Sequence, residues 1–173
     1  MPEVGLLTEL RRSHTPSSRA TTIAHVPMSR PLRREREVVA ICRVLPLVLA
    51  RAIRCRRAIA SIPDLRTLLY TIDAESASHR WKRQVEAHDL VRATNISLRI
   101  LRAPDRSCVL RSATLYSTLR GMGRTAAFVS GVRRLGGDID GHAWVESPSL
   151  PLSLTGDQLS STVFAEGFRH PPP

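Results

Sequence analysis

The sequence is poor in lysine, in aromatic residues and in long apolar runs. Lys82 is the only lysine, so arginine carries nearly all of the positive charge of this 173-residue chain. Only seven aromatic residues are spread along the chain, which gives no stacking platform for single-stranded nucleic acid. The longest charge-free apolar stretch near the N-terminus, residues 44–50, is far shorter than the roughly 20 residues of a membrane span. These absences argue against nucleic-acid binding and against a transmembrane protein.

Cysteine is also scarce. Cys42, Cys55 and Cys108 are an odd number of cysteines, which does not suit a disulfide framework. No Cys-x-x-Cys or His-x-x-x-His spacing indicates a metal site. Charged residues precede any apolar run at the N-terminus, so the pattern of a secretory signal is missing. We therefore expect a cytoplasmic protein without a metal.

The net charge of +11 is uneven, because residues 1–58 contain 12 arginines and four acidic residues. Such a surface attracts anionic partners by long-range steering. Two hypotheses follow that do not require an enzyme. One is an arginine-rich binding or adaptor protein whose cysteines are inert. The other, which we treat as secondary, is association of an apolar helix over residues 38–53 with a membrane surface.

The pattern of apolar residues divides the chain into three regions. Residues 1–30 have no apolar period and are predicted to be a flexible arm. Residues 31–100 are predicted to form helices over 33–60, 65–77 and 81–101, the first kinked or divided by Pro46. Residues 101–173 form the predicted core. The apolar face of the first helix is predicted to contain Val38, Ile41, Cys42, Leu45, Leu49 and Ile53.

In the core, a helix is expected to begin beside Cys108, to be capped by Asp105 or Ser107, and to end at Gly121–Gly123. Strands are predicted over 125–132, 141–146 and 150–154, with a glycine-rich loop over 133–140. The expected fold class is therefore α+β. A helical layer precedes a cysteine-bearing helix that packs on a small antiparallel sheet.

One pair of residues in this core carries chemistry. The unpaired amides at a helix start stabilise a thiolate, which makes Cys108 a candidate nucleophile. His142 lies in the middle of a predicted strand and is the candidate base. Alternation along the strand places His142, Trp144 and Glu146 on one face. A third group is expected to orient the imidazole: Asp157 is the first candidate, and Glu146 and Ser153 are alternatives. The other histidines lie in predicted tails or helices.

Several sequence blocks resemble a known family. They are Cys108-Val109-Leu110-Arg111-Ser112, Leu115-Tyr116, Leu119-Arg120 up to Gly123, Ser130-Gly131-Val132 and Gly141-His142-Ala143-Trp144-Val145-Glu146. Their order and spacing are similar to those of the transglutaminase-like cysteine peptidase domain of lasso peptide biosynthesis B2 proteins. The similarity is close over about residues 95–157 and is general in character over 33–94.

The resemblance implies a transglutaminase-like or papain-like core and a peptidase that removes the leader from a ribosomally made precursor peptide. It implies Cys108 as nucleophile, His142 as base and then acid, and Asp157 as the orienting group, with no cofactor and with backbone amides at the helix start as oxyanion donors. We further expect Trp144, Arg111 and Glu146 to contact substrate.

The partners implied by the resemblance are the precursor peptide, a small leader-recognition protein of the B1 type supplied in trans and, as a further candidate, the macrolactam synthetase. The arginines of the helical region, including Arg33, Arg34, Arg51 and Arg54, are the predicted docking surface. Within enzymes, acyl transfer to an amine on the same fold is the alternative to hydrolysis.

Overall fold

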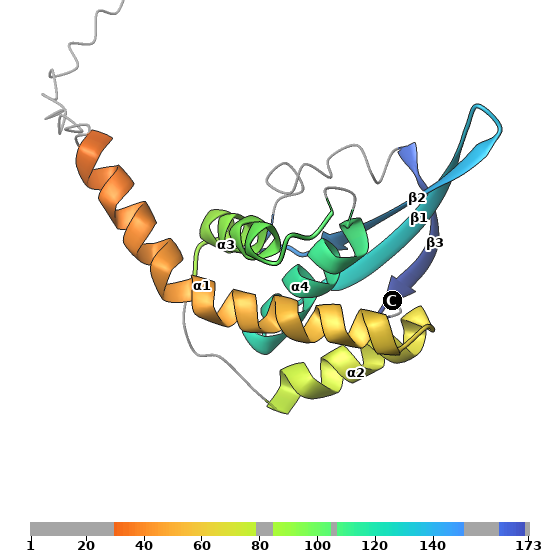
Figure 1. Ribbon diagram of the computed structural model, residues 1–173, viewed down its shortest axis with the longest axis horizontal. Helices are drawn as coiled ribbons and strands as arrows, with labels where there is room; N and C mark the ends of the chain where they lie inside the picture. The colour runs from red at the N-terminus through yellow and green to blue at the C-terminus, as the bar shows by residue number, and fades with distance from the viewer. Residues whose placement is uncertain (1–29, 79–84, 105–106, 151–162, 172–173) are drawn as a thin grey trace, which may run out of the picture.

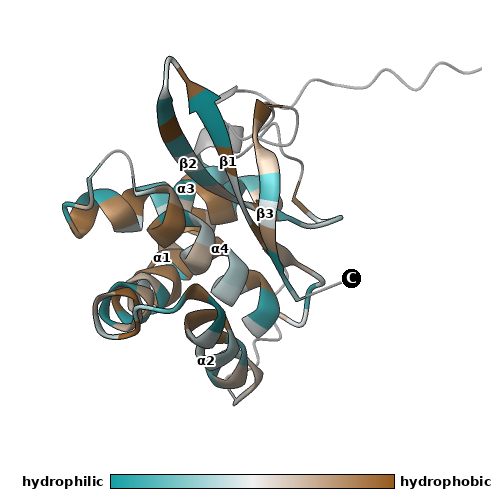
Figure 2. Ribbon diagram, turned by 90° about the vertical axis from the view of Figure 1, so that its right-hand side faces the viewer, coloured by the Kyte–Doolittle hydropathy of each residue, from teal (hydrophilic) through white to brown (hydrophobic). Residues whose placement is uncertain are grey.

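The computed structural model describes residues 30–78, 85–104, 107–150 and 163–171. These residues form helices and then strands, which confirms the predicted α+β class. The helices are α1 (Arg30–Ser61), α2 (Leu65–Ser78), α3 (Ala87–Ile100) and α4 (Cys108–Gly121), and the strands are β1 (Ala127–Leu135), β2 (Asp138–Glu146) and β3 (Ala165–His170). The strands form an antiparallel sheet in the order β2-β1-β3. The helices lie on one side of this sheet, as Figures 1 and 2 show.

Helix α4 is the centre of the fold. It contacts α1, α2 and α3 as well as β1 and β2, so its residues from Ser112 to Leu119 are all buried. The buried hydroxyls are satisfied locally: Thr114 and Thr118 each donate to the carbonyl four residues earlier. Gly123 ends the helix with a φ of +72°, and the amides of Gly123 and Arg124 donate to the carbonyls of Arg120 and Leu119. This is the Schellman pattern, so the predicted glycine C-cap is confirmed.

Helix α1 continues through Pro46 and bends along its length (Figure 1). Proline removes one backbone hydrogen bond from a helix, and α1 accommodates this loss by bending instead of dividing into two helices. The predicted apolar face is confirmed in part: Leu45 packs partly buried against the core, but the buried face is centred about one position away from the prediction. Val38 is 54% exposed and Cys42 is also exposed, whereas the side chains that enter the core are Val44, Val48, Ala52 and Cys55.

Helix α2 matches its prediction, but α3 begins later than expected. Glu86 is its N-cap, so Val85 precedes the helix, and Trp81 lies outside the described residues. Ile100, which was predicted to face the core, is 54% exposed. The residues of α3 that are buried are Asp89, Leu90, Val91, Ala93, Thr94, Ser97 and Leu98.

The sheet differs from the prediction in two places. Residues 133–140 do not form a loop, because β1 and β2 continue to a two-residue turn at Gly136 and Gly137, both of which have positive φ. The third strand is β3, which pairs with β1 on the side away from β2. Within the region predicted as the third strand, Leu150 forms an isolated bridge with Ser147, and residues 151–154 lie outside the described part of the chain.

The described helices include none with the length and apolar character that a membrane crossing requires. The predicted flexible arm over 1–30 lies almost entirely outside the described residues. The division of the rest into a docking region and a catalytic core stays a prediction.

Candidate active site

Cys108 is the first residue of α4, as predicted, and its side chain is partly buried against the core. Ser107 occupies the N-cap position, but its hydroxyl makes no cap hydrogen bond. It donates instead to the carbonyl oxygen of Pro104 at 2.7 Å. The prediction that the Ser107 side chain accepts from the first-turn amides is therefore wrong, and the alternative cap, Asp105, is outside the described residues. Ser107 leaves those amides to other acceptors.

His142 lies in the middle of β2, opposite Gly131 of β1. Its neighbour Ala143 belongs to the core on the helical side of the sheet, so His142 and Trp144 point to the opposite face, in agreement with the predicted alternation. The imidazole stacks against the indole of Trp144, with ring centroids 6.3 Å apart and planes at 16°. It also meets the ring of Phe164, whose centroid is 5.3 Å away. Two aromatic rings therefore fix the plane of the imidazole.

Phe164 was not predicted from the sequence. It precedes β3 and reaches the site because β3 lies beside β1. The guanidinium of Arg133 lies over this ring, with its Cζ atom 4.6 Å from the ring centroid. Arg133 is held in turn by Asp140, through an Nε–Oδ2 hydrogen bond of 2.9 Å. The layer around His142 thus depends on contacts among all three strands.

Gly131 makes this close layer possible. A Cβ atom at this position would lie 2.7 Å from the carbonyl oxygen of Ala165 and 3.1 Å from both Phe164 Cβ and Trp144 Cη2. Real Cβ atoms do not approach a backbone oxygen that closely, so any side chain at residue 131 must push the aromatic layer away from the sheet. The glycine of the Ser130-Gly131-Val132 block is therefore a packing requirement of the site.

One hydrogen bond joins the start of α4 to the strand that carries His142. The hydroxyl of Ser112, one turn after Cys108, donates to the carbonyl oxygen of Ala143 at 2.9 Å. Ser112 is 1% exposed, so this bond is shielded from water. It fixes the first turn of α4 against the edge of β2 at the residue next to His142. The fold therefore places the helix that begins with Cys108 beside the strand that carries His142. Among the described residues no hydrogen bond joins the Cys108 thiol to the His142 imidazole, which points to the face of the sheet away from the helices, so the catalytic pair stays a prediction.

Glu146 and Trp144 contact each other and the third strand. The indole nitrogen of Trp144 donates to Glu146 Oε1 at 3.0 Å, and Arg169 of β3 donates to Glu146 Oε2 at 2.9 Å. Burial of Glu146 favours its neutral form, but these hydrogen bonds, from Arg169 first, outweigh burial and lower its pKa. The substrate contacts predicted for Trp144, Glu146 and the half-buried Arg111 stay predictions.

The third catalytic group is not settled by these contacts. Glu146 is four residues from His142 along one strand, which corresponds to about 13 Å between backbone positions. Its carboxylate is also occupied by Trp144 and Arg169. The first candidate, Asp157, and the alternative Ser153 both lie outside the described residues.

The other two cysteines have different surroundings. Cys42 is exposed on α1. Cys55 is 2% exposed, and burial raises the pKa of its thiol to about 12. Neither lies at the start of a helix, so Cys108 is the only one of the three with the position that a nucleophile requires. The described residues hold no group of three or more His, Cys, Asp or Glu side chains suited to a metal ion.

A polar cluster at the other end of α4 was missed by the sequence reasoning. His170, which was assigned to a tail, is 2% exposed at the end of β3. Its Nε2 lies 2.9 Å from Asp73 Oδ2, which also accepts from the hydroxyl of Tyr116 at 2.7 Å. Arg120 Nε donates to the other oxygen, Asp73 Oδ1, at 3.0 Å. Burial and the Asp73 hydrogen bond raise the pKa of Tyr116. The carboxylate therefore ties α2, α4 and β3 together.

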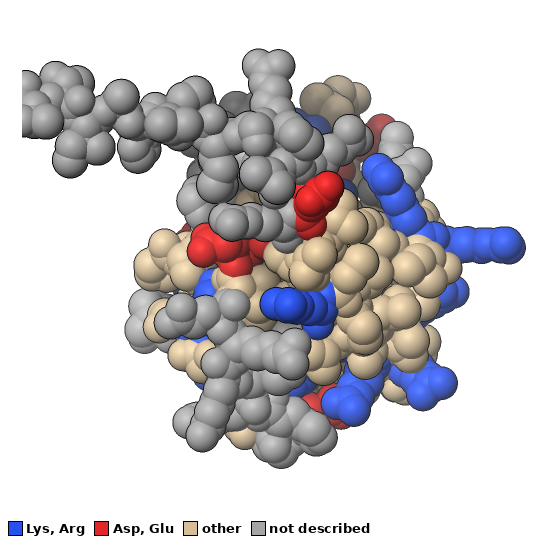
Figure 3. Space-filling view, turned by 90° about the vertical axis from the view of Figure 1, so that its left-hand side faces the viewer, with Lys and Arg blue, Asp and Glu red and all other residues tan. Residues whose placement is uncertain are grey.

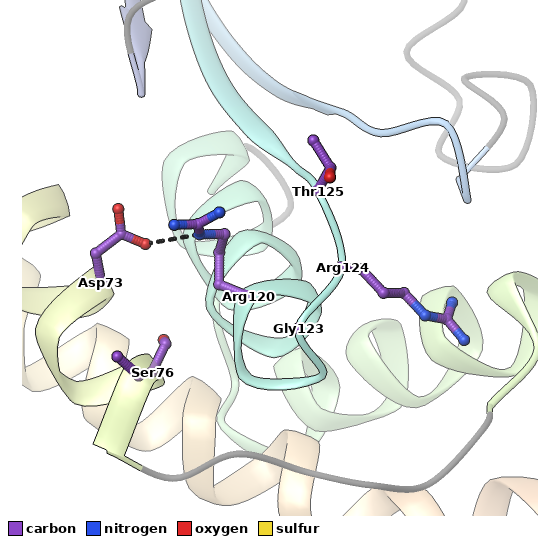
Figure 4. Close-up of a pocket in the computed structure, with 7 residues that line it drawn as sticks. Asp73, Ser76, Arg120, Gly123, Arg124 and Thr125 are labelled. Carbon is purple, nitrogen blue, oxygen red and sulfur yellow. Dashed lines mark hydrogen bonds and ion pairs between the residues drawn. The ribbon is translucent and has the colours of Figure 1, made fainter.

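Figure 4 shows the pocket beside this cluster, with Asp73 and Arg120 joined across it and Arg124 turned away. The pocket has a volume of about 160 Å³. Because Arg120 is neutralised by Asp73 and Arg124 donates to the carbonyl of Val85, both guanidiniums already have partners. The pocket is a gap between helices whose charges are satisfied.

The fold and the site define a cysteine-bearing helix packed against a histidine-bearing antiparallel sheet. A comparison with protein families agrees: residues 48–165 match the model of the transglutaminase-like superfamily. The chain belongs to this superfamily, which includes cysteine peptidases and acyltransferases and whose fold is typically that of a cysteine-dependent enzyme. No curated protein and no solved structure matches the chain.

Proposed function

We propose that the protein is a cysteine peptidase that removes the leader from a ribosomally synthesised precursor peptide of the lasso type. The observation that carries the proposal is the hydrogen bond from Ser112 to Ala143, which brings the helix start with Cys108 to the strand with His142. Membership of the transglutaminase-like superfamily supports cysteine chemistry. The resemblance of the Cys108, Gly131 and His142 blocks to lasso peptide biosynthesis B2 proteins supports the substrate class.

In the proposed reaction, Cys108 Sγ attacks the carbonyl carbon of the scissile bond while His142 takes the thiol proton. The tetrahedral oxyanion is stabilised by backbone amides at the start of α4. His142 then gives its proton to the leaving amine, and a thioester remains on Cys108. Water, deprotonated by His142, hydrolyses this thioester and releases the acid. Asp157 is the proposed group that orients the imidazole.

Acyl transfer is the second candidate, because the superfamily also includes acyltransferases. The two reactions share the thioester and differ only in whether water or an amine accepts the acyl group. The product mass separates them: hydrolysis adds one water across the cleaved bond, whereas transfer adds the mass of the amine to the acyl fragment.

The proposal includes a leader-recognition protein in trans, and the precursor and the macrolactam synthetase as further partners. One residue of the predicted arginine docking surface is unsuited to it. Arg51 Nη1 lies 3.2 Å from the hydroxyls of Ser76 and Ser117, so this guanidinium is turned into the fold. In the view of Figure 3, arginine side chains project singly along one side of the molecule and do not form a continuous patch. Arg54 is exposed and remains in the proposed surface.

The first test needs no substrate, because the chain contains its own reference thiols. We expect iodoacetamide to label Cys108 rapidly even below pH 7, whereas exposed Cys42, which has no catalytic partner in the proposal, is expected to label slowly under the same conditions. Buried Cys55 is expected to stay unlabelled until the protein unfolds. Mass spectrometry of the digested protein reports all three rates from one sample.

Three variants complete the test. His142→Ala is expected to slow labelling of Cys108 below pH 7 at least tenfold, while His88→Ala, a half-exposed imidazole on α3, is expected to leave it unchanged. With a lasso-type precursor and its leader-binding partner, Cys108→Ala is expected to reduce leader cleavage by about 10⁴-fold or more. If Cys108 labels at the rate of Cys42 and ignores the loss of His142, the peptidase proposal is wrong and the arginine-rich adaptor is favoured.

A further inference from the structure

The β1–β2 hairpin extends past the rest of the sheet. Strand β3 pairs with β1 only as far as Val132, whereas β1 and β2 continue pairing to Leu135 and Asp138. Figures 1 and 2 show the hairpin end projecting beyond the helices. Apolar side chains on this projection are exposed: Val132 by 51%, Leu135 by 59% and Ile139 by 74%. The hairpin therefore presents apolar surface that the fold does not cover.

The register shows which backbone groups of β2 face outward. In a two-residue hairpin, the residues that flank the turn form a hydrogen-bonded pair, and such pairs alternate with pairs whose amides and carbonyls point away. Leu135 and Asp138 flank the turn, so Ile139 and every second residue after it direct their N–H and C=O groups to the outer edge. Ala143 confirms this parity, because its carbonyl accepts from Ser112 on that edge.

Ile139 and Gly141 therefore offer backbone donors and acceptors along the outer edge of β2. Within the described ranges, β1 is the only strand that pairs with β2. Gly141 is exposed, and a Cβ atom built on it meets nothing within 4 Å. A second backbone can thus approach this edge closely, at the residue next to His142.

We propose that an extended peptide substrate binds as an additional strand along the outer edge of β2, with its backbone hydrogen-bonded to Ile139 and Gly141. This inference rests on the proposed peptidase function and names how that enzyme holds its substrate. Strand addition supplies affinity through main-chain hydrogen bonds and specificity through alternate side chains. A substrate strand here passes directly beside His142 and the start of α4.

The side chains on this edge predict the preferred substrate. Ile139 and Val132 share the face of the sheet that carries Ala143 further along, since Ile139 pairs with Arg134 and Val132 pairs with Gly141. A substrate residue opposite Ile139 contacts this apolar pair. Two residues away, the substrate residue opposite Gly141 meets open space. We therefore expect an apolar residue at the first position and a bulky residue accommodated at the second.

The occupant is a substrate and not a second copy of the chain, because of where the edge lies. Proteins usually protect a long exposed edge with proline or charged side chains, lysine above all. Residues 138–143 contain no proline and no lysine, and of their two aspartates Asp140 is paired with Arg133 of β1. A second copy paired at Ile139 and Gly141 would cover the approach to His142. An edge that no other described strand pairs with, one residue from the candidate base, suits a strand that arrives and leaves during turnover.

The test uses probes that label Cys108 without requiring cleavage. A heptapeptide ending in a vinyl sulfone, with leucine at alternate positions, is compared with methyl vinyl sulfone on the full-length protein. We expect the peptide to label Cys108 at least tenfold faster than the small electrophile. Single N-methylation along the peptide is expected to lower this rate about tenfold at every second residue and to have little effect between them, because alternate amides pair with β2.

Two variants of the edge separate backbone pairing from side-chain contact. Ile139→Pro removes the outward amide at a position where an edge strand tolerates proline, and Ile139→Thr keeps that amide while removing the apolar side chain. We expect Ile139→Pro to lower peptide labelling about tenfold below Ile139→Thr. Both variants are expected to keep the thermal unfolding midpoint and the methyl vinyl sulfone rate of the parent protein.

The outcomes distinguish the two proposals. Equal peptide labelling in Ile139→Pro and Ile139→Thr, or no alternation in the N-methyl scan, overturns the edge-strand proposal even when Cys108 is activated. Slow labelling of Cys108 by both electrophiles, independent of His142, overturns the peptidase proposal instead. A dimer in solution that Ile139→Pro dissociates would show that a second copy occupies the edge, which also overturns the substrate proposal.

Discussion

The two ends of α4 are held in different ways. At the C-terminal end, the Schellman turn at Gly123 and the hydrogen bonds of Tyr116 and Arg120 to Asp73 fix the helix to α2 and β3. At the N-terminal end, Ser107 turns its hydroxyl away from the helix, and the hydrogen bond from Ser112 is the side-chain link to the sheet. The polar contacts are thus concentrated at the end farthest from Cys108. A rigid far end positions the helix, and the near end keeps its thiol partly accessible.

The largest loss of stability is expected at the C-terminal end of α4, which the contacts to Asp73 hold in place. Asp73→Ala leaves the buried side chains of His170 and Tyr116, and the partly exposed Arg120, without their common acceptor, so we expect it to lower the free energy of unfolding by about 3 kcal/mol. Asp140→Ala is the matched control, because Asp140 pairs with Arg133 where both side chains are a third or more exposed. We expect that control to cost about 1 kcal/mol or less. Urea unfolding measures both.

Equal losses in the two variants would show that the Asp73 cluster does not anchor α4. The labelling rate of Cys108 is the second measurement. If the Asp73 contacts position α4, Asp73→Ala is expected to alter that rate while the protein is still folded. A change that appears only where the protein begins to unfold would show that these contacts stabilise the fold without positioning Cys108.

Most of the elements near Cys108 were predictable because their signals are local. A cysteine after a Pro-Asp-Arg-Ser turn indicates a helix start, and glycines at 121 and 123 indicate its end. The placement of His142 on the face of the strand opposite Ala143 and Val145 could likewise be predicted from the sequence. In the same way, Gly136-Gly137 is a standard hairpin signal, and it was missed because the charged residues Arg133, Arg134, Asp138 and Asp140 around it resemble a loop.

The Asp73 cluster could not be predicted, because its members are far apart in the sequence. His170 is 97 residues from Asp73 and belongs to a six-residue strand with three exposed positions at its start. Nothing local marks such a segment as part of the core. Phe164 entered the site for the same reason: its place beside His142 depends on β3 pairing with β1, a long-range pairing that apolar periodicity does not indicate.

The second test concerns the face of the sheet that carries His142. Gly131→Ala forces a Cβ atom against the carbonyl of Ala165 and the ring of Trp144, so we expect a loss of about 2 kcal/mol in the free energy of unfolding. Gly141→Ala, on the neighbouring strand, meets no atom within 4 Å and is expected to change stability by about 0.5 kcal/mol or less. Thermal unfolding of the two variants measures the difference.

The same two glycine variants also test whether the aromatic packing around His142 controls the reactivity of Cys108. Gly131→Ala is expected to slow Cys108 labelling below pH 7, because it displaces the aromatic layer that fixes the plane of the His142 ring. Gly141→Ala leaves that layer intact and is expected to keep the labelling rate. A Gly131→Ala protein that is as stable as its parent and labels as fast would show that the layer does not position His142.

The smallest loss of stability is expected at the N-terminal end of α4, where the same substitution is expected to affect Cys108 specifically. Ser112→Ala removes the hydroxyl that satisfies the buried carbonyl of Ala143, which is expected to cost about 1 kcal/mol. Ser97→Ala is the matched control, since the hydroxyl of Ser97 is equally buried but donates to Ala93 within its own helix. The stability losses of the two variants are expected to be similar.

Their effects on Cys108 are expected to differ, because only Ser112 joins the helix start to the strand of His142. We expect Ser112→Ala to slow Cys108 labelling below pH 7 severalfold and Ser97→Ala to leave it unchanged. Ser112→Thr, which retains a hydroxyl, is expected to recover part of the rate, as a positioning role requires. If Ser112→Ala and Ser97→Ala lower stability alike and both leave the labelling rate intact, the link between α4 and β2 supports the fold alone, and the alignment of Cys108 with His142 must come from other contacts.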